Sequence, residues 1–170
     1  MEIQLKNTEF VIKINSKGAE LVSIQKKETS REYIWDGNPK FWGKHSPVLF
    51  PIVGTLKDNC YFYKNQKYKL SRHGFARGLE FEITEQTENR VIFGLKATEE
   101  TRTKFPFEFE LQINYQFVDT KLSIKYKITN RRIHCEAFEA PLTSINDPLC
   151  IMKKRSEVIS ICIFSIKSKK

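Results

Sequence analysis

Apolar and polar residues alternate with a period of two along most of the chain. The alternating segments are rich in aromatic and β-branched residues, and they lie at Glu9–Ile14, Cys60–Leu70, Leu79–Thr84, Arg90–Ala97, Phe107–Phe117 and Lys121–Thr129. Because successive side chains of a strand point to opposite faces of a sheet, this period predicts half-buried antiparallel strands. No window of a dozen residues repeats the helical period of about 3.6 residues. We therefore predict an all-β fold, an antiparallel β-sandwich with little helix.

Two kinds of segment interrupt the alternation. Short turn signals separate the predicted strands at Asn15–Gly18, Lys64–Gln66, Thr87–Asn89 and Val118–Thr120. The other interruption is Lys44–Asn59, a continuous apolar run that is bracketed by Pro47 and Pro51 and closed by Gly54. A run of this kind is too apolar for a surface strand, so we predict a buried loop and strand beneath another part of the protein.

The composition of the sequence changes after Asn130. Residues 131–170 hold three of the four cysteines but no tryptophan or tyrosine, and their one strand-like segment, EVISICIFSIK, is flanked by lysines that act as solubilising residues. We therefore predict two parts: residues 1–130 as the N-terminal part of a sandwich, and residues 131–170 as a divergent tail.

Composition narrows the classes of function. A chain of 170 residues is long enough for one domain, which buries about 70% of its unfolded surface. The start of the chain lacks the features of a secretory signal, and no apolar stretch is long enough to span a membrane, so we expect a cytoplasmic protein without membrane contact. The four cysteines lack metal-ligand spacing, so we expect free thiols and no metal. The net charge of +9 is spread over strand faces, which argues against nucleic-acid binding.

One polar cluster stands out between the predicted strands. Residues 70–81 read LSRHGFARGLEF and place two arginines, a histidine and two glycines within a dozen positions. The cluster is either a turn with incidental charges or the polar part of a ligand site.

Three ordered segments, Gly18–Ile24, Glu32–Asn59 and Tyr68–Ile83, resemble the aldose 1-epimerase superfamily, in particular its LacX-like branch of galactose mutarotase-like proteins. The resemblance covers about residues 1–130. It implies a large antiparallel β-sandwich whose concave face holds a monosaccharide or a sugar phosphate. The implied activity is interconversion of the α and β anomers of an aldose without a cofactor, because ring opening needs only a positioned acid and base. A non-catalytic carbohydrate-binding protein is the alternative.

The resemblance assigns roles to residues of the polar cluster. His73 matches a sugar-binding histidine of the family, and its alternative is a hydrogen bond to a buried loop carbonyl. Arg77 either binds sugar hydroxyls or a phosphate, or pairs with Glu80 or Glu82. Arg72 is a weaker sugar contact that otherwise faces water. Gly74 is expected to allow a close backbone approach, and Phe75 to pack inward.

A second group of candidates precedes the cluster. Trp35 and Trp42 flank a predicted turn at Asp36 and Asn38; their rings suit the apolar face of a pyranose, but core packing is the alternative for at least one of them. We take Trp35 as a substrate contact. His45 is either a residue at the rim of the site or an exposed histidine without a role.

The chain departs from the family pattern in three ways. Thr55 stands where many mutarotases carry a sugar-binding arginine, and Gly78 stands where an acidic residue is usual. The second half of the family's sandwich is not recognisable. Residues 133–142, IHCEAFEAPL, resemble an HPAF-like segment of the family, and this resemblance makes His134 the candidate general acid. No residue matches the general base of the family. Glu157 is expected to be a surface residue. We therefore expect a truncated or frameshifted chain that exposes sheet edges and self-associates through them.

Overall fold

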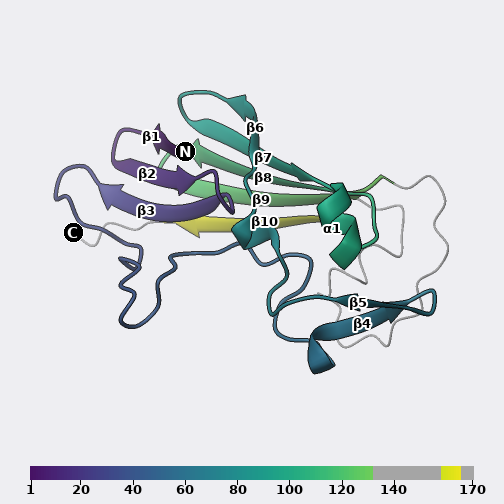
Figure 1. The fold of residues 1–170 in the computed structure, drawn as a ribbon. Helices are drawn as coiled ribbons and strands as arrows, with labels where there is room; N and C mark the ends of the chain where they lie inside the picture. Colours follow the sequence, from purple (N-terminus) through teal and green to yellow (C-terminus); the bar gives the residue numbers. More distant parts are fainter. Residues whose placement is uncertain (132–157, 166–170) are drawn as a thin grey trace.

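The first sheet of the protein is formed by the N-terminal strands β1 (Glu2–Lys6), β2 (Phe10–Asn15) and β3 (Glu20–Lys26). The structure, a computed structural model, describes residues 1–131 and the backbone of residues 158–165. The three strands pair antiparallel in the order β1-β2-β3, and the register shifts between Lys13 and Ile14. Figure 1 shows this sheet beside the N-terminus.

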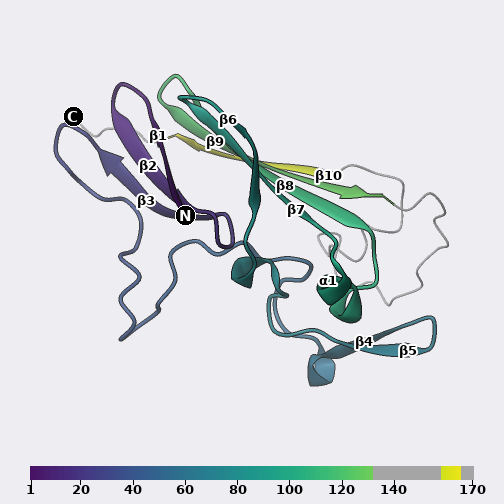
Figure 2. The same ribbon diagram turned by 45° about the horizontal axis from the view of Figure 1, so that its top comes forward.

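A larger antiparallel sheet contains five strands in the order β10-β9-β8-β7-β6. Its members are β6 (Glu82–Gln86), β7 (Arg90–Lys96), β8 (Phe109–Val118), β9 (Lys121–Asn130) and β10 (Val158–Ser165). The strands β8 and β9 pair without interruption over ten residues each. β10 lies within the strand-like segment EVISICIFSIK, so that prediction is confirmed. Figure 2 shows the two sheets side by side and inclined to each other.

The two sheets bury one shared apolar core. Val91, Phe93 and Leu95 of β7 alternate inward with exposed fractions of 0 to 6%, as the period of two requires. The Tyr115 hydroxyl of β8 donates a 2.8 Å hydrogen bond to the Ala19 carbonyl, which ties the sheets together. The predicted all-β antiparallel sandwich is confirmed.

Short elements connect and flank the sheets. The hairpin β4 (Cys60–Tyr63) and β5 (Gln66–Lys69) turns at Lys64 and Asn65, both with positive φ. Two 3-10 turns are η1 (Lys57–Asn59) and η2 (Ala76–Gly78). The six-residue helix α1 (Glu99–Lys104) begins with a reciprocal capping box between Thr98 and Thr101. Six residues are too few to show helical periodicity, and the threonine spacing was the available signal.

The strand prediction needs correction at four places. The strands β1 and β3 were not predicted, because β1 is short and β3 buries the charged Glu20 next to Leu21, which breaks the alternation. The strand predicted within Lys44–Asn59 is wrong: Phe50 makes only a single bridge, to Gly74. The buried loop predicted there is confirmed by Val48, Phe50 and Ile52, which are 2 to 4% exposed.

The strand predicted at Leu79–Thr84 begins later, at Glu82. The backbone of the preceding residues pairs instead with the turn between β2 and β3, since Gly18 N–H donates to the Leu79 carbonyl at 2.7 Å and Phe81 N–H donates to the Ser16 carbonyl at 3.0 Å. This segment therefore crosses from one sheet to the other.

The strand β6 forms one edge of the larger sheet. Its pairing with β7 is interrupted by a bulge between Ile83 and Glu85, and most of its side chains are exposed. Glu85 also forms a 3.0 Å ion pair with Arg90. In the part of the chain that the structure describes, no helix is long and apolar enough to cross a membrane.

Candidate functional site

The polar cluster at residues 70–81 is anchored to the buried loop through Phe50. The Phe50 carbonyl accepts hydrogen bonds from the N–H groups of Phe75 at 2.9 Å and Ala76 at 3.2 Å. Gly74 has a φ of +71°, and a Cβ atom placed on it would lie 2.1 Å from the Phe50 carbonyl oxygen. A side chain at this position would block the contact, so the predicted close approach at Gly74 is confirmed.

The same cluster is joined to the turn between β2 and β3 of the first sheet. Gly18 has a φ of +75°, and a Cβ atom on it would lie 3.0 Å from the Arg77 carbonyl oxygen. Together with the bond from Gly18 N–H to the Leu79 carbonyl, this packing brings the three family-like segments into one assembly.

His73 is the side chain whose chemistry is most constrained. Its backbone has a φ of +66°, its N–H donates to the Gly54 carbonyl at 2.8 Å, and its Nδ1 accepts from Gly54 N–H at 2.9 Å. Its Nε2 lies 3.1 Å from the Nε–H of Arg72. A neutral imidazole has only one acceptor nitrogen, so these two ring contacts cannot both be hydrogen bonds.

The contact between His73 Nδ1 and Gly54 N–H is the hydrogen bond. It is the shorter of the two and is partly buried, whereas the contact with Arg72 is exposed. Nδ1 is therefore the acceptor, and the proton of the neutral ring lies on Nε2. The Arg72 guanidinium then faces an N–H group, which makes it easy to displace by a ligand oxygen that accepts from Nε2–H.

The surroundings of His73 oppose its protonation. Partial burial of the ring lowers its pKa, and the positive charges of Arg72 and Arg77 lower it further. Because the folded pKa lies below the unfolded value, the neutral ring contributes to stability above about pH 6.5. That contribution is lost as the pH falls through the folded pKa.

An NMR titration of the His73 ring checks this electrostatic description. We expect a pKa below about 6.5, and we expect Arg77→Gln to raise it because one of the two neighbouring cations is removed. Arg31→Gln removes an equal charge at Tyr33, where the guanidinium carbon lies 5.4 Å from the ring centre, and should leave the pKa of His73 unchanged. A pKa at or above the usual value would contradict the description.

The Arg77 side chain bonds to the backbone of its own turn. Its Nη2 donates to the Arg72 carbonyl at 3.0 Å. Among the described residues it forms no ion pair with Glu80 or Glu82, so that alternative is not realised. The positive charge of this guanidinium lies close enough to His73 to lower the pKa of the ring.

His45 lies in a second polar cluster, around the buried carboxylate of Glu20. Glu20 is 6% exposed, and its Oε1 accepts from the backbone N–H groups of His45 at 2.8 Å and Ser46 at 3.1 Å. The His45 ring lies beside Gly37, where an added Cβ atom would meet it at 2.7 Å. Glu20 therefore fixes the end of the loop that precedes the apolar run.

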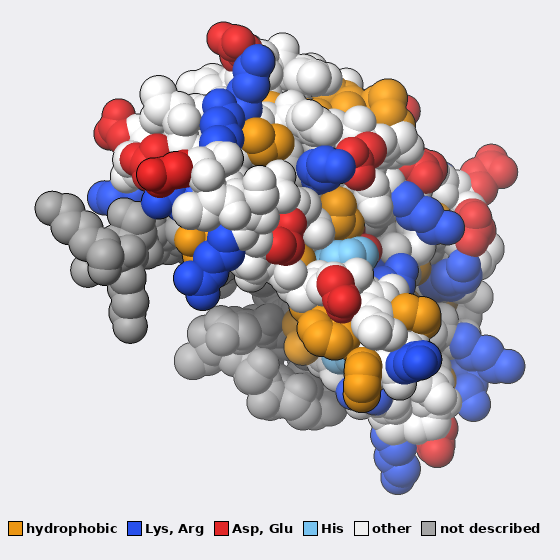
Figure 3. Space-filling model, turned by 90° about the vertical axis from the view of Figure 1, so that its left-hand side faces the viewer, with side chains coloured by type: hydrophobic (Ala, Val, Ile, Leu, Met, Phe, Trp, Pro, Cys, Tyr) orange, Lys and Arg blue, Asp and Glu red, His pale blue; other side chains and the backbone are white. Residues whose placement is uncertain are grey.

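That loop presents an exposed aromatic group. Trp35 is 42%, Phe41 79% and Trp42 50% exposed, so the alternative of core packing for a tryptophan is wrong. The Trp35 Nε1–H donates to the Trp42 carbonyl at 2.8 Å, which fixes the loop. The predicted turn is confirmed, since Asp36 accepts from Asn38 N–H at 3.0 Å. Figure 3 shows hydrophobic side chains gathered on this side of the molecule next to histidine.

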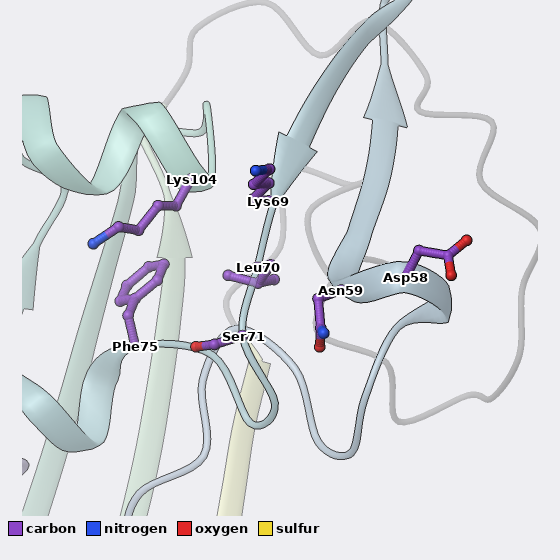
Figure 4. Close-up of a pocket in the computed structure, with 7 residues that line it drawn as sticks. All are labelled: Asp58, Asn59, Lys69, Leu70, Ser71, Phe75 and Lys104. Atoms are coloured by element: carbon purple, nitrogen blue, oxygen red, sulfur yellow. The ribbon is translucent and has the colours of Figure 1, made fainter.

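A cavity of about 580 Å³ flanks the other side of the polar cluster, between the hairpin β4–β5 and α1 (Figure 4). It is lined by Asp58, Asn59, Lys69, Leu70, Ser71, Phe75 and Lys104. Leu70 and Phe75 point toward the space between these elements, whereas Asp58 points away from it. Phe75 also packs against Phe50 and Phe109, with ring centres 6.1 and 5.9 Å apart, so its predicted inward packing is confirmed.

Several residues that the sequence analysis singled out lie wholly or partly outside the described residues. His134, Glu157 and the cysteines at 135 and 150 lie outside the described residues, and the side chain of Cys162 does too. Cys60 is a free thiol. No group of three or more potential metal ligands occurs within residues 1–131.

The sequence interpretation missed two groups of the site, the Glu20 carboxylate and the Gly54 amide. The available signal for Glu20 was a charged residue inside the apolar segment GAELVSI.

Solved structures identify the class of protein that this fold defines. A galactose mutarotase related enzyme from Lactobacillus acidophilus superimposes with a TM-score of 0.75 at 41% sequence identity, over 76% of this chain and 43% of that one. A galactose mutarotase-like protein from Lactobacillus casei gives a TM-score of 0.74 at 37% identity, over 76% of this chain and 44% of that one. The fold is galactose mutarotase-like.

The sequence places the chain within a family. The aldose 1-epimerase family profile matches residues 1–141, and the chain belongs to this family. It is 33% identical over 135 residues to the plasmid and chromosomal LacX proteins of Lactococcus lactis subsp. lactis, which covers 76% of this chain and 45% of each of theirs. The chain thus spans less than half the length of these relatives.

Proposed function

We propose that the chain contributes the sugar-binding N-terminal part of an aldose 1-epimerase, which interconverts the α and β anomers of a free or phosphorylated hexose. In this proposal residues 1–130 form that part and act in the cytoplasm. Ring opening needs a proton delivered to the ring oxygen and a proton removed from the anomeric hydroxyl, and both transfers are acid–base steps.

The fixed tautomer of His73 carries the proposal. Gly54 N–H occupies Nδ1 at 2.9 Å, so the ring offers Nε2–H as a donor to a sugar oxygen. The lowered pKa keeps the ring neutral near pH 7. Arg77 and Arg72 supply further donors beside it, and these suit either sugar hydroxyls or a phosphate.

Other residues have supporting roles in this proposal. The exposed face of Trp35 can stack on the apolar face of a pyranose. His45 lies at the end of the same loop, where Glu20 fixes its backbone. His134 remains the candidate general acid, and the general base remains unassigned.

Anomer exchange on freshly dissolved α-glucose and α-galactose tests the catalytic proposal. Followed by polarimetry or exchange NMR, the full chain should accelerate exchange over buffer. The His73→Gln variant should lower kcat/KM about tenfold, the factor for one substrate hydrogen bond of about 1.4 kcal/mol. Gly78→Ala is the matched control in the same cluster, because an added Cβ atom meets nothing within 4 Å. No acceleration by the unaltered chain would contradict catalysis.

One observation favours carbohydrate binding without catalysis as the second candidate. Within the described residues, the polar contacts of the His73 ring and the Arg77 guanidinium are with backbone groups and with Arg72, and no carboxylate is among them. Titration with the same sugars, followed by the fluorescence of Trp35 and Trp42, separates the two candidates. Binding without anomer exchange supports the second candidate, and a flat titration contradicts both.

A further inference from the structure

A second cavity lies on the outer face of the five-stranded sheet. Its volume is about 250 Å³, and it is lined by Arg90, Ile92, Gln112, Asn114, Lys125 and Lys127. The alternation along β7 places Val91 and Phe93 in the core and Arg90 and Ile92 on the opposite face. The polar cluster packs on the core side, where the rings of Phe50 and Phe109 lie 5.0 Å apart. The two sites are therefore on opposite faces of the sheet.

Two side chains that line this cavity each contain a buried polar atom without a partner. The two atoms are Nε of Arg90, which carries a hydrogen and donates, and Oδ1 of Asn114, which accepts. Within the described part of the chain, no other side-chain nitrogen or oxygen is both buried and unpartnered. Such atoms are rare in folded proteins because each one costs about 1–3 kcal/mol, so their occurrence in two side chains that line one cavity indicates a ligand with matching groups.

The side chains around these atoms are held in place. The Arg90 guanidinium is anchored through Nη1, which lies 3.0 Å from Oε1 of Glu85. Asn114 lies directly between Ile92 and Lys125 in the register of the three strands β7, β8 and β9. Ile92 gives the cavity an apolar wall, and the exposed Lys125 gives it a positive charge.

We propose that this cavity binds a hydroxylated anion of about one sugar ring, a sugar phosphate or a sugar acid. A hydroxyl group both donates and accepts, so hydroxyls of one ring can accept from the Arg90 Nε–H and donate to Asn114 Oδ1. The anionic group is attracted by the Lys125 ammonium. The volume lies below the range of about 300–1,000 Å³ that is usual for drug-sized ligands, which fits a single ring.

Binding measurements on the full chain test this site. Glucose 6-phosphate, glucuronate, glucose and inorganic phosphate are titrated separately, and amide shifts of β7, β8 and β9 are followed by NMR. We expect glucose 6-phosphate or glucuronate to bind at least tenfold more tightly than glucose or phosphate alone. The phosphate and carboxylate arms show which anion the site takes.

Two variants and one control locate the binding. Asn114→Leu removes the buried acceptor at similar volume, and Lys125→Gln removes the charge; each should weaken binding at least fivefold. Lys121→Gln removes the same charge from the same strand and face but outside the cavity, and it should change binding less than twofold. Equal weakening by Lys121→Gln, no effect of Asn114→Leu, or no shifts on these strands would overturn the proposal. His73→Gln should leave this binding unchanged, which separates it from the function proposed above.

Discussion

The Gly74→Ala variant is expected to lose about 2–6 kcal/mol of unfolding free energy. The left-handed backbone accounts for about 1–3 kcal/mol of this for a residue other than glycine. Forcing a methyl group against the Phe50 carbonyl and the Pro51 ring adds a similar overpacking cost of about 1–3 kcal/mol. Because a domain of this size is stable by only about 5–15 kcal/mol, the loss should be visible as a large shift of the urea midpoint.

Gly78→Ala is the matched control for this measurement. Gly78 lies four residues further along the same cluster, its φ is not positive, and an added Cβ atom meets nothing within 4 Å. Its unfolding free energy should change by no more than about 0.5 kcal/mol. Equal stability of the Gly74→Ala and Gly78→Ala variants would show that the contact between Gly74 and Phe50 does not constrain the fold.

The Phe50→Ala variant is expected to lose about 3–5 kcal/mol, the usual cost of removing a buried phenylalanine side chain. Phe50 is 2% exposed, and its ring lies 5.0 to 6.1 Å from the rings of Phe109, Phe105 and Phe75. These rings come from the sheet, the end of α1 and the polar cluster, so the cavity left by alanine would loosen all three.

Phe62→Ala provides the comparison for Phe50→Ala. Phe62 is 64% exposed on the hairpin, so its removal should change the unfolding free energy by about 0.5 kcal/mol or less. Both variants are measured by urea denaturation at one pH. A loss below about 1 kcal/mol for Phe50→Ala would contradict the role of Phe50 as the centre of this aromatic cluster.

The sandwich could be predicted because its central strands obey a simple alternation. The core-facing residues of β8 have exposed fractions of at most 3%, and the residues between them are more polar; they are Phe109, Leu111, Ile113, Tyr115 and Phe117. The segment Leu79–Phe81 could not be placed in this way. Its backbone partners, Ser16 and Gly18, are more than 60 positions away, and the pattern within the segment itself does not encode them.

The candidate site was predictable as a set of residues but not as an arrangement. The residues around His73 carry the family resemblance. The tautomer of the His73 ring, however, depends on the N–H group of Gly54, which lies in a different loop. The exposure of Trp35 and Trp42 could likewise not be predicted from the sequence, because aromatic residues next to a turn occur both in cores and on surfaces. The outer cavity with Asn114 was missed because polar residues on an outward face of a strand are expected at the surface.

The bulge in β6 bears on how this protein behaves at high concentration. An edge strand that is long, flat and apolar pairs readily with the edge of another molecule, and the sequence led us to expect self-association of this kind. At this edge the register is broken between Ile83 and Glu85, and Glu82 and Glu85 carry negative charge along an exposed strand. A second copy approaching this edge would meet a like charge and a mismatched ladder, so the bulge and the two carboxylates oppose intermolecular strand pairing at β6.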